Sequence, residues 1–212
     1  MINFIPLFPL SIVVYPEETL NMHIFEPKYK QLIKEAVEHK KPFGVLPVID
    51  SQKQENGTLM EILEVTKTYV TGEMDIKTRG KKVFKILEHI EQVPDKLYNG
   101  AIVTYPENKL HGRKLLMNNL ISLVKVLHDL LKVENPLSHT SKELKSYDIA
   151  HRVGLTLGQE YELLTFMEEL HRQEYLKQHL AKVIPVVAEM EALKAKIKLN
   201  GHFKNISGFN IS

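Results

Sequence analysis

The chain has 212 residues, of which 43% are hydrophobic and 25% are charged, as in ordinary globular proteins. Its formal net charge of +2 is too small to indicate nucleic acid or an anionic membrane as the default partner. It contains no cysteine, which excludes disulfides, thiolate metal ligands and thiol nucleophiles. The first residues lack a basic stretch, and no apolar run approaches the ~18 residues of a membrane span. We therefore expect a cytoplasmic protein with no membrane partner.

The first predicted element is an apolar strand within residues 5–10 that two prolines interrupt. Pro6 and Pro9 have no N–H to donate to a sheet ladder, so this strand belongs at an edge or is interrupted. A second short apolar run follows at residues 20–25. Residues 27–39 then predict a helix, because they begin with proline and their apolar side chains recur at spacings of three and four.

The remainder of the first half is strand-like. Residues 43–49 form a nearly continuous apolar run, which is typical of a buried strand. Residues 58–65 alternate with a shift of phase that a bulge would explain. Turn-forming residues around Gly72 predict a hairpin, and further strands are expected near residues 83–87 and 98–105. Several short strands at close spacing indicate a twisted sheet or a small barrel.

After Pro106 the period of the apolar residues becomes helical. The final helix is predicted to be the longest, and Pro185 should kink or divide it, since proline removes one backbone hydrogen bond. The predicted helices cover residues 110–131, 141–154, 161–170 and 176–197.

The change of period predicts an α+β chain with two subdomains. We expect a β-rich subdomain over residues 1–106 and an α-helical subdomain over residues 107–200. Residues 201–212 are short, polar and glycine-containing, so we expect them to form a flexible tail.

Several motifs occur in a fixed order along the chain, namely residues 5–31, Phe43-Gly44-Val45, Gly57-Thr58-Leu59, Gly80, Phe84-Lys85-Ile86, Ala101-Ile102-Val103, Leu163-Leu164 and Arg172. Their ordered combination resembles the N-terminal, substrate-binding domain of Lon, the ATP-dependent protease. The resemblance covers roughly residues 4–198 and implies a PUA-like pseudo-barrel with one helix, followed by a helical bundle with a long final helix. The chain departs from the family at Glu17-Glu18, because the family usually has glycine after the position of Pro16.

A complete Lon enzyme would also need a phosphate-binding loop and a Ser-Lys dyad. The Walker pattern requires two glycines five residues apart, followed by lysine and a hydroxyl residue. Gly72 and Gly80 are eight residues apart, and no hydroxyl residue follows Lys81. We therefore predict neither ATP hydrolysis nor proteolysis, and no cofactor.

The ten histidines do not predict a metal site. His151, His171 and His179 lie on predicted helices, but no two of them are four residues apart, the spacing that places two ligands on one helix face. We expect no bound metal.

The leading hypothesis is a non-catalytic module that binds unfolded or exposed apolar polypeptide segments. Tyr15, Pro16, Leu20 and Met22 are the candidate contacts, because they flank an irregular polar loop. Apolar burial and hydrogen bonds to a strand edge or loop would hold the segment. Each of these side chains is equally compatible with a place in the core.

Three residues at the start of the first predicted helix also have two interpretations. The charge of Glu26 suits the helix dipole, Pro27 suits the first turn, and Tyr29 lies on the apolar face. The interpretation in which they begin and pack the helix, with Phe25 and Tyr29 in the core, is favoured over direct contact with a ligand.

A second hypothesis is an RNA- or nucleotide-binding PUA-like module. Basic side chains cluster near Phe84, and such a cluster beside an aromatic ring can hold a phosphate backbone and stack a base. We favour the alternative, a solvated strand edge whose lysines discourage pairing with other sheets, because the chain is nearly neutral. The candidate basic residues are Lys77, Arg79, Lys81 and Lys82.

A third hypothesis is a scaffold or adaptor. In that case the helical half would dock onto a separate ATPase or protease, or onto a second copy of the chain. The long final helix is the feature that suggests it.

Overall fold

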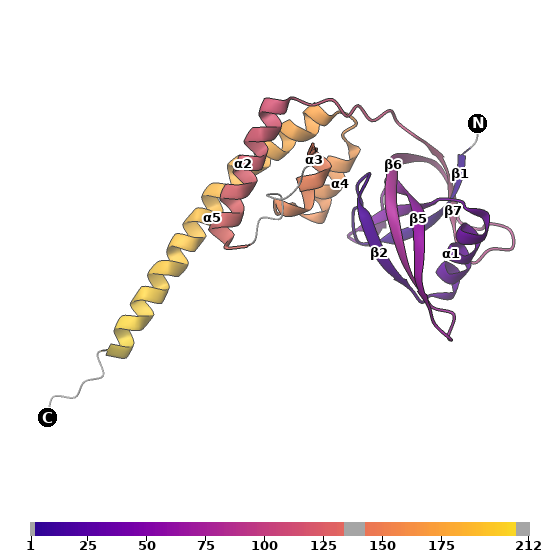
Figure 1. Ribbon diagram of the computed structural model, residues 1–212, viewed down its shortest axis with the longest axis horizontal. Helices are drawn as coiled ribbons and strands as arrows, with labels where there is room; N and C mark the ends of the chain where they lie inside the picture. The colour runs from indigo at the N-terminus through magenta and orange to yellow at the C-terminus, as the bar shows by residue number, and fades with distance from the viewer. Residues whose placement is uncertain (1–2, 134–142, 207–212) are drawn as a thin grey trace. The chain divides into compact units, whose positions relative to one another are not determined.

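The structure is a computed structural model that describes residues 3–133 and 143–206, with side chains up to residue 198. The chain forms two compact units (Figure 1). The first contains Met1–Leu110 and Gly154–Glu169, and the second contains His111–Val153 and Leu170–Ser212. This division differs from the expected boundary at residue 106, because residues 154–169 belong to the first unit.

The first unit is built on a seven-stranded sheet of order β1-β7-β6-β5-β3-β4. Strand β1 also pairs with β3, in parallel, so that five of the strands close into a barrel. This arrangement confirms the predicted pseudo-barrel. The strands are β1 (Asn3–Leu10), β2 (Thr19–Ile24), β3 (Phe43–Ile49), β4 (Gln52–Lys53), β5 (Asn56–Thr68), β6 (Met74–Ile90) and β7 (Gly100–Thr104).

Strand β6 has 17 residues and pairs along both of its sides. Strand β5 pairs with it over residues 74–85 on one side. On the other side, β2 pairs with residues 74–79 and β7 pairs with residues 85–90. Two short strands therefore share one side of a long strand.

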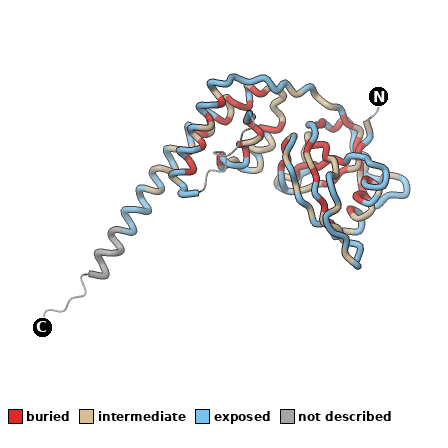
Figure 2. The backbone as a smooth tube through the Cα atoms, viewed as in Figure 1, coloured by how far each residue is buried: buried red, intermediate tan, exposed pale blue. Residues whose placement is uncertain are grey.

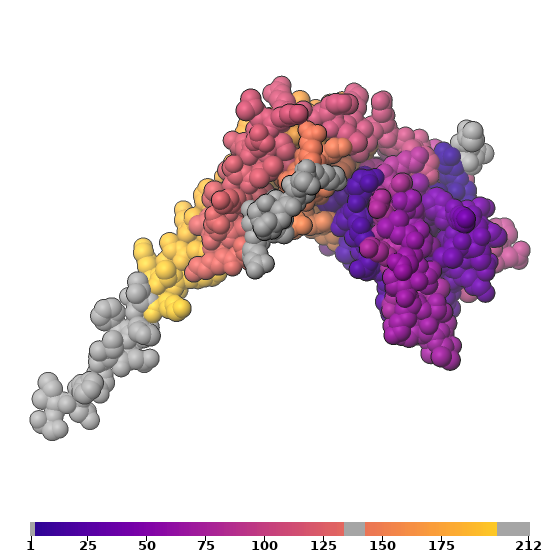
Figure 3. All heavy atoms as spheres, in the orientation of Figure 1, coloured from indigo at the N-terminus to yellow at the C-terminus, as the bar shows by residue number. Residues whose placement is uncertain are grey.

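The β5–β6 ladder is irregular. Its register shifts between Leu59 and Met60, between Ile62 and Glu64, and between Val65 and Lys67. Such bulges explain the shift of phase in the sequence of this strand. The hairpin turns at residues 69–73, where Gly72 has a φ of 77°, and its tip projects from the first unit (Figure 3).

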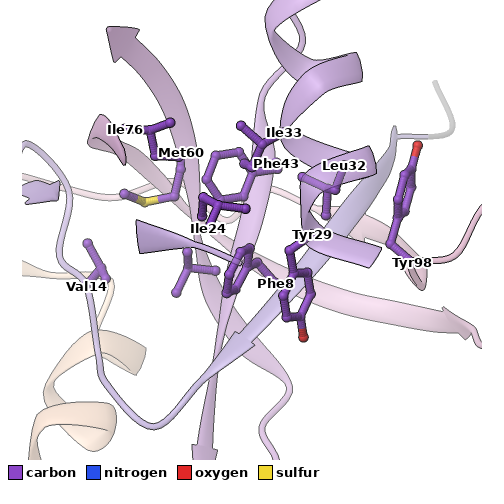
Figure 4. Close-up of a cluster of buried hydrophobic side chains, with 11 residues drawn as sticks. Phe8, Val14, Ile24, Tyr29, Leu32, Ile33, Phe43, Met60, Ile76 and Tyr98 are labelled. Carbon is purple, nitrogen blue, oxygen red and sulfur yellow. The ribbon is translucent and has the colours of Figure 1, made fainter. Parts of the chain in front are cut away.

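Helix α1 (Pro27–His39) covers the main core cluster of the barrel (Figure 4). Leu32 and Ile33 of the helix are fully buried against Phe43 of β3. The rings of Phe8 and Tyr29 stack with their centroids 3.9 Å apart, which joins β1 to the first turn of α1. Tyr29 therefore has the core position that we favoured for it.

Polar contacts fix helix α1 to the segment before β7. The Tyr98 hydroxyl donates a hydrogen bond of 2.7 Å to Glu35, and Lys96 forms an ion pair of 2.9 Å with the same carboxylate. Gln31 accepts a hydrogen bond of 2.8 Å from the Leu97 N–H. These contacts hold α1, and hence the residues at its start, in one position on the barrel.

Helix α4 (Leu157–Thr165) belongs to the first unit because it contacts the barrel through long-range hydrogen bonds. The Tyr15 hydroxyl donates a bond of 3.0 Å to the Glu160 carbonyl, and the Tyr161 hydroxyl accepts one of 3.3 Å from the Asn56 N–H. Thr156 caps the helix by accepting a bond from the Gln159 N–H.

The second unit consists of α2 (Lys114–Leu131), α3 (Ser146–Ile149), the 3-10 turn η2 (Ala150–Arg152) and α5 (Glu169–Ile206). Arg172 is fully buried, donates to the Tyr147 hydroxyl at 3.2 Å and lies over the Tyr147 ring. Helix α5 continues through Pro185 rather than ending there. It also includes the first six residues of the predicted tail, whereas residues 207–212 lie outside the described part of the chain.

Burial in α5 ends well before the helix does (Figure 2). Leu176 and Leu180 are fully buried, but none of the residues 181–198 is. Exposed apolar residues recur at spacings of four, three and four along this part of the helix, namely Val186, Met190, Leu193 and Ile197.

The loop before β2 contains a turn in which Glu17 has a positive φ of 69°. Pro16 precedes it, and the Glu18 N–H donates to the Tyr15 carbonyl, as in a type II turn. The turn is bonded to β6, because the Glu17 N–H donates to the Gly80 carbonyl at 2.8 Å and the Gly80 N–H donates to the Glu18 carbonyl at 2.9 Å. A side chain at position 80 would collide with the Tyr15 carbonyl oxygen. The turn thus keeps the conformation that glycine favours.

We predict that Glu17→Gly stabilises the protein. A side chain in the left-handed region costs about 1–2 kcal/mol, and the extra entropy of unfolded glycine offsets roughly half of that. The expected gain in the free energy of unfolding is up to about 1 kcal/mol, measured by urea denaturation. Glu17→Ala is the matched control, because it removes the same carboxylate and keeps the Cβ atom. An equal gain in both variants would contradict the prediction.

Candidate functional site

The first unit carries an apolar groove with a volume of about 370 Å³. It lies between strand β2, the end of strand β1 and the start of helix α1. Closure of the barrel brings these segments together. The residues that line the groove are Phe8, Leu10, Ile12, Leu20, Asn21, Met22, His23, Ile24, Phe25, Glu26 and Tyr29.

The floor of the groove is part of the core. Leu10, Leu20 and Met22 are partly buried and pack against the cluster that contains the stacked rings of Phe8 and Tyr29. The rim is more open, since Phe25 is 60% exposed. The groove therefore combines a rigid apolar floor with an exposed aromatic side chain at its edge.

A polar cluster lies beside His23, on the outer face of β2. His23 Nδ1 is 2.6 Å from Asp75 Oδ1, and the Tyr69 hydroxyl donates to Asp75 Oδ2 at 2.8 Å. The hydrogen bond from His23, followed by that from Tyr69, lowers the pKa of the Asp75 carboxyl below its usual value. His23 also stacks on Phe25, with ring centroids 6.1 Å apart. These contacts thus position His23 and Phe25, two of the side chains that line the groove.

Two of the four predicted contact residues line the groove. Leu20 and Met22 do so, from the inner face of β2. Tyr15 is buried, with 1% of its surface exposed, and its hydroxyl is bonded to Glu160, so its side chain packs in the interior and is not available to a ligand. Pro16 lies in the turn described above and is not among the lining residues.

Of the three residues considered at the start of helix α1, Glu26 and Tyr29 are among those that line the groove, and Pro27 is not. Glu26 is at the N-cap of α1 and also lines the groove, where it forms an ion pair of 3.1 Å with Lys28. Pro27 is the first residue of the helix, and Tyr29 contributes a buried ring. The expected core position of Phe25 is wrong, because this side chain is 60% exposed and lines the groove. Strand alternation from the inward-facing Ile24 places Phe25 on the outer side.

The predicted basic residues do not form an unopposed positive surface. In the β5–β6 ladder Lys77 is in register with Glu64, and Arg79 with Glu61. Lys81 forms an ion pair of 3.2 Å with Glu61. These carboxylates offset the charge that a phosphate backbone would need.

Lys82, the fourth predicted basic residue, packs on an aromatic ring. The Lys82 ammonium lies over the Tyr105 ring, 4.0 Å from its centroid. Within residues 3–133 and 143–198, no cluster of three or more histidine or carboxylate side chains is arranged to hold a metal ion.

The family model for the substrate-binding domain of ATP-dependent protease La (Lon) matches residues 5–191. The chain belongs to this family. Its fold is similar to that of a Lon N-terminal domain protein from Xanthomonas campestris, with a TM-score of 0.63 at 23% identity. It is equally similar to the N-terminal domain of the Mycobacterium avium complex Lon protease, with a TM-score of 0.63 at 15% identity. Each match covers 84% of this chain and 98% of the other.

Membership of the Lon substrate-binding family makes this chain a substrate-recognition module. A comparison with curated protein sequences finds no match. No helix in the described part of the chain is both long and apolar enough to span a membrane.

We predict that Tyr69→Phe raises the pKa of Asp75 toward its ordinary value. The substitution removes a hydrogen bond that stabilises the carboxylate, so the charged form is favoured less. Carboxyl-detected NMR titration measures the shift. Tyr105→Phe, which removes a hydroxyl that has no contact with Asp75 among those described, should leave the titration unchanged. An unchanged Asp75 pKa in Tyr69→Phe would contradict the contact.

Proposed function

We propose that this chain is a non-catalytic module that recognises unfolded or exposed apolar polypeptide segments and binds them in the groove beside β2. The observation that carries the proposal is the combination of an apolar floor and the exposed rim residue Phe25. Membership of the Lon substrate-binding family supports a role in recognition. The groove adds a surface whose chemistry suits apolar side chains.

The floor favours apolar groups over charged ligands. Leu10, Leu20 and Met22 offer no hydrogen-bonding side chains, so a charged ligand placed on them would lose hydration without gaining a partner. Apolar burial is worth roughly 25 cal/mol per Å² before the costs of association, so a groove of this size binds weakly, on the order of micromolar or worse.

We predict that Phe25→Ala and Met22→Ala each weaken polypeptide binding about tenfold, because each removes part of the apolar surface of the groove. Fluorescence anisotropy with a labelled, permanently unfolded polypeptide measures the dissociation constant. Leu87→Ala is the matched control: Leu87 is also a well-exposed apolar residue of the first unit, 64% exposed, but it does not line the groove.

The same titrations separate the alternatives. Equal binding by the Phe25, Met22 and Leu87 variants would contradict the groove as the binding site. Binding to a short single-stranded RNA alone, lost as salt rises, would move the function to the basic residues of β6. If neither ligand binds, the scaffold role of residues 107–200 is the better explanation.

A further inference from the structure

We infer that the groove takes its ligand as an added β-strand on the free edge of β2. The ligand is an extended polypeptide segment, held by backbone hydrogen bonds, with an apolar side chain at every second position. This inference rests on the proposed function, because it specifies the conformation of the polypeptide that binds there.

The lining of the groove shows that a strand edge faces it. Side chains of a strand point alternately to opposite faces, so a groove on one face is lined by every second residue. Strand β1 and the residues after it follow that rule and contribute Phe8, Leu10 and Ile12. The β2 segment instead contributes six consecutive residues, 20–25. Consecutive residues of a strand meet one groove only when the edge of the strand, with its backbone, lies along it.

The pairing of the strands leaves this edge open. Among the described residues, β2 pairs with β6 alone, through residues 19–24 (Figure 1). Strand β1, which lies across the groove, pairs with β7 and β3 instead. In an antiparallel ladder every second residue directs its N–H and C=O groups away from its partner strand. Since residues 20–25 line the groove and β6 lies on the other side of β2, we place those groups along the groove.

The side chains around this edge define the ligand. Leu20 and Met22 lie on the inner face, so they suit apolar side chains of the ligand. Asn21 and His23 lie on the outer face, so they suit polar ones. A strand added to β2 keeps the same alternation, so its residues alternate between apolar and polar. A helix does not fit this description, because its backbone groups are already bonded to one another.

The test uses a labelled peptide of about eight residues, near the usual length of a strand, with alternating valine and threonine and terminal lysines. Single backbone N-methyl groups are placed in turn at each central position. Methylation removes one N–H donor and leaves the side chain in place. In an added strand only every second N–H faces β2, so we expect binding to weaken about tenfold at alternate positions and to change little at those between. Neighbouring positions serve as matched controls for each other.

A second measurement locates the edge on the protein. Amide hydrogen exchange by NMR should show that the unmethylated peptide slows exchange at every second residue of positions 19–24. This measurement requires no substitution in the protein, so the outcome does not depend on whether a variant folds.

The outcomes distinguish this inference from the proposed function. Binding of the unmethylated peptide with equal effects at all methylated positions would overturn strand addition and leave the groove as a side-chain site. Failure of the unmethylated peptide to bind would overturn both. A stable dimer, detected by sedimentation, whose β2 amides are protected without peptide would show that a second copy occupies the edge, and would also overturn the inference.

Discussion

The sharing of strand β6 between two short strands is the constraint on which the groove depends. Strand β7 links β6 to β1 and so continues the barrel wall, whereas β2 pairs with the other part of β6 and with no other strand in the described part of the chain. The barrel is therefore closed where β7 lies and open beside β2. Unpaired backbone at the edge of a sheet is a site for another strand, and most proteins protect it. Here it lies along an apolar floor.

The floor is fixed before any ligand arrives. The stacked rings of Phe8 and Tyr29 join β1 to α1, and Glu35 holds α1 through Tyr98 and Lys96. A binding site that is already ordered loses little conformational entropy when it is filled. The turn at Glu17 has the complementary role of anchoring the loop before β2, through its bonds with Gly80.

The sequence predicted the helices and strands better than it predicted which of them contact one another. Periodicity identified the strands and helices because alternation and the helical repeat are local properties. Leu20 and Met22 were indicated for a different reason, because they flank an irregular polar loop. The loop alone could not separate them from Tyr15, which is buried and whose hydroxyl is bonded to Glu160, 145 positions away. The same contact places α4 with the barrel. The turn with a positive φ at Glu17 is easier to locate from the sequence. Pro16 precedes it, and the Lon family usually has glycine at the next position.

The proposed strand addition would give a small groove a means of selecting unfolded chains. Burying two apolar side chains gains about 3–6 kcal/mol and each backbone hydrogen bond about 1 kcal/mol, against an association cost of at least about 4 kcal/mol. So little net free energy gives weak binding and little preference for any one sequence. A folded protein has most of its backbone groups paired internally and its sheet edges usually protected, so it offers few free strands to add. An unfolded chain offers free backbone along its whole length. In the proposed mode of binding, selectivity for the unfolded state comes from the availability of the backbone, and the apolar floor decides which segments are held longest.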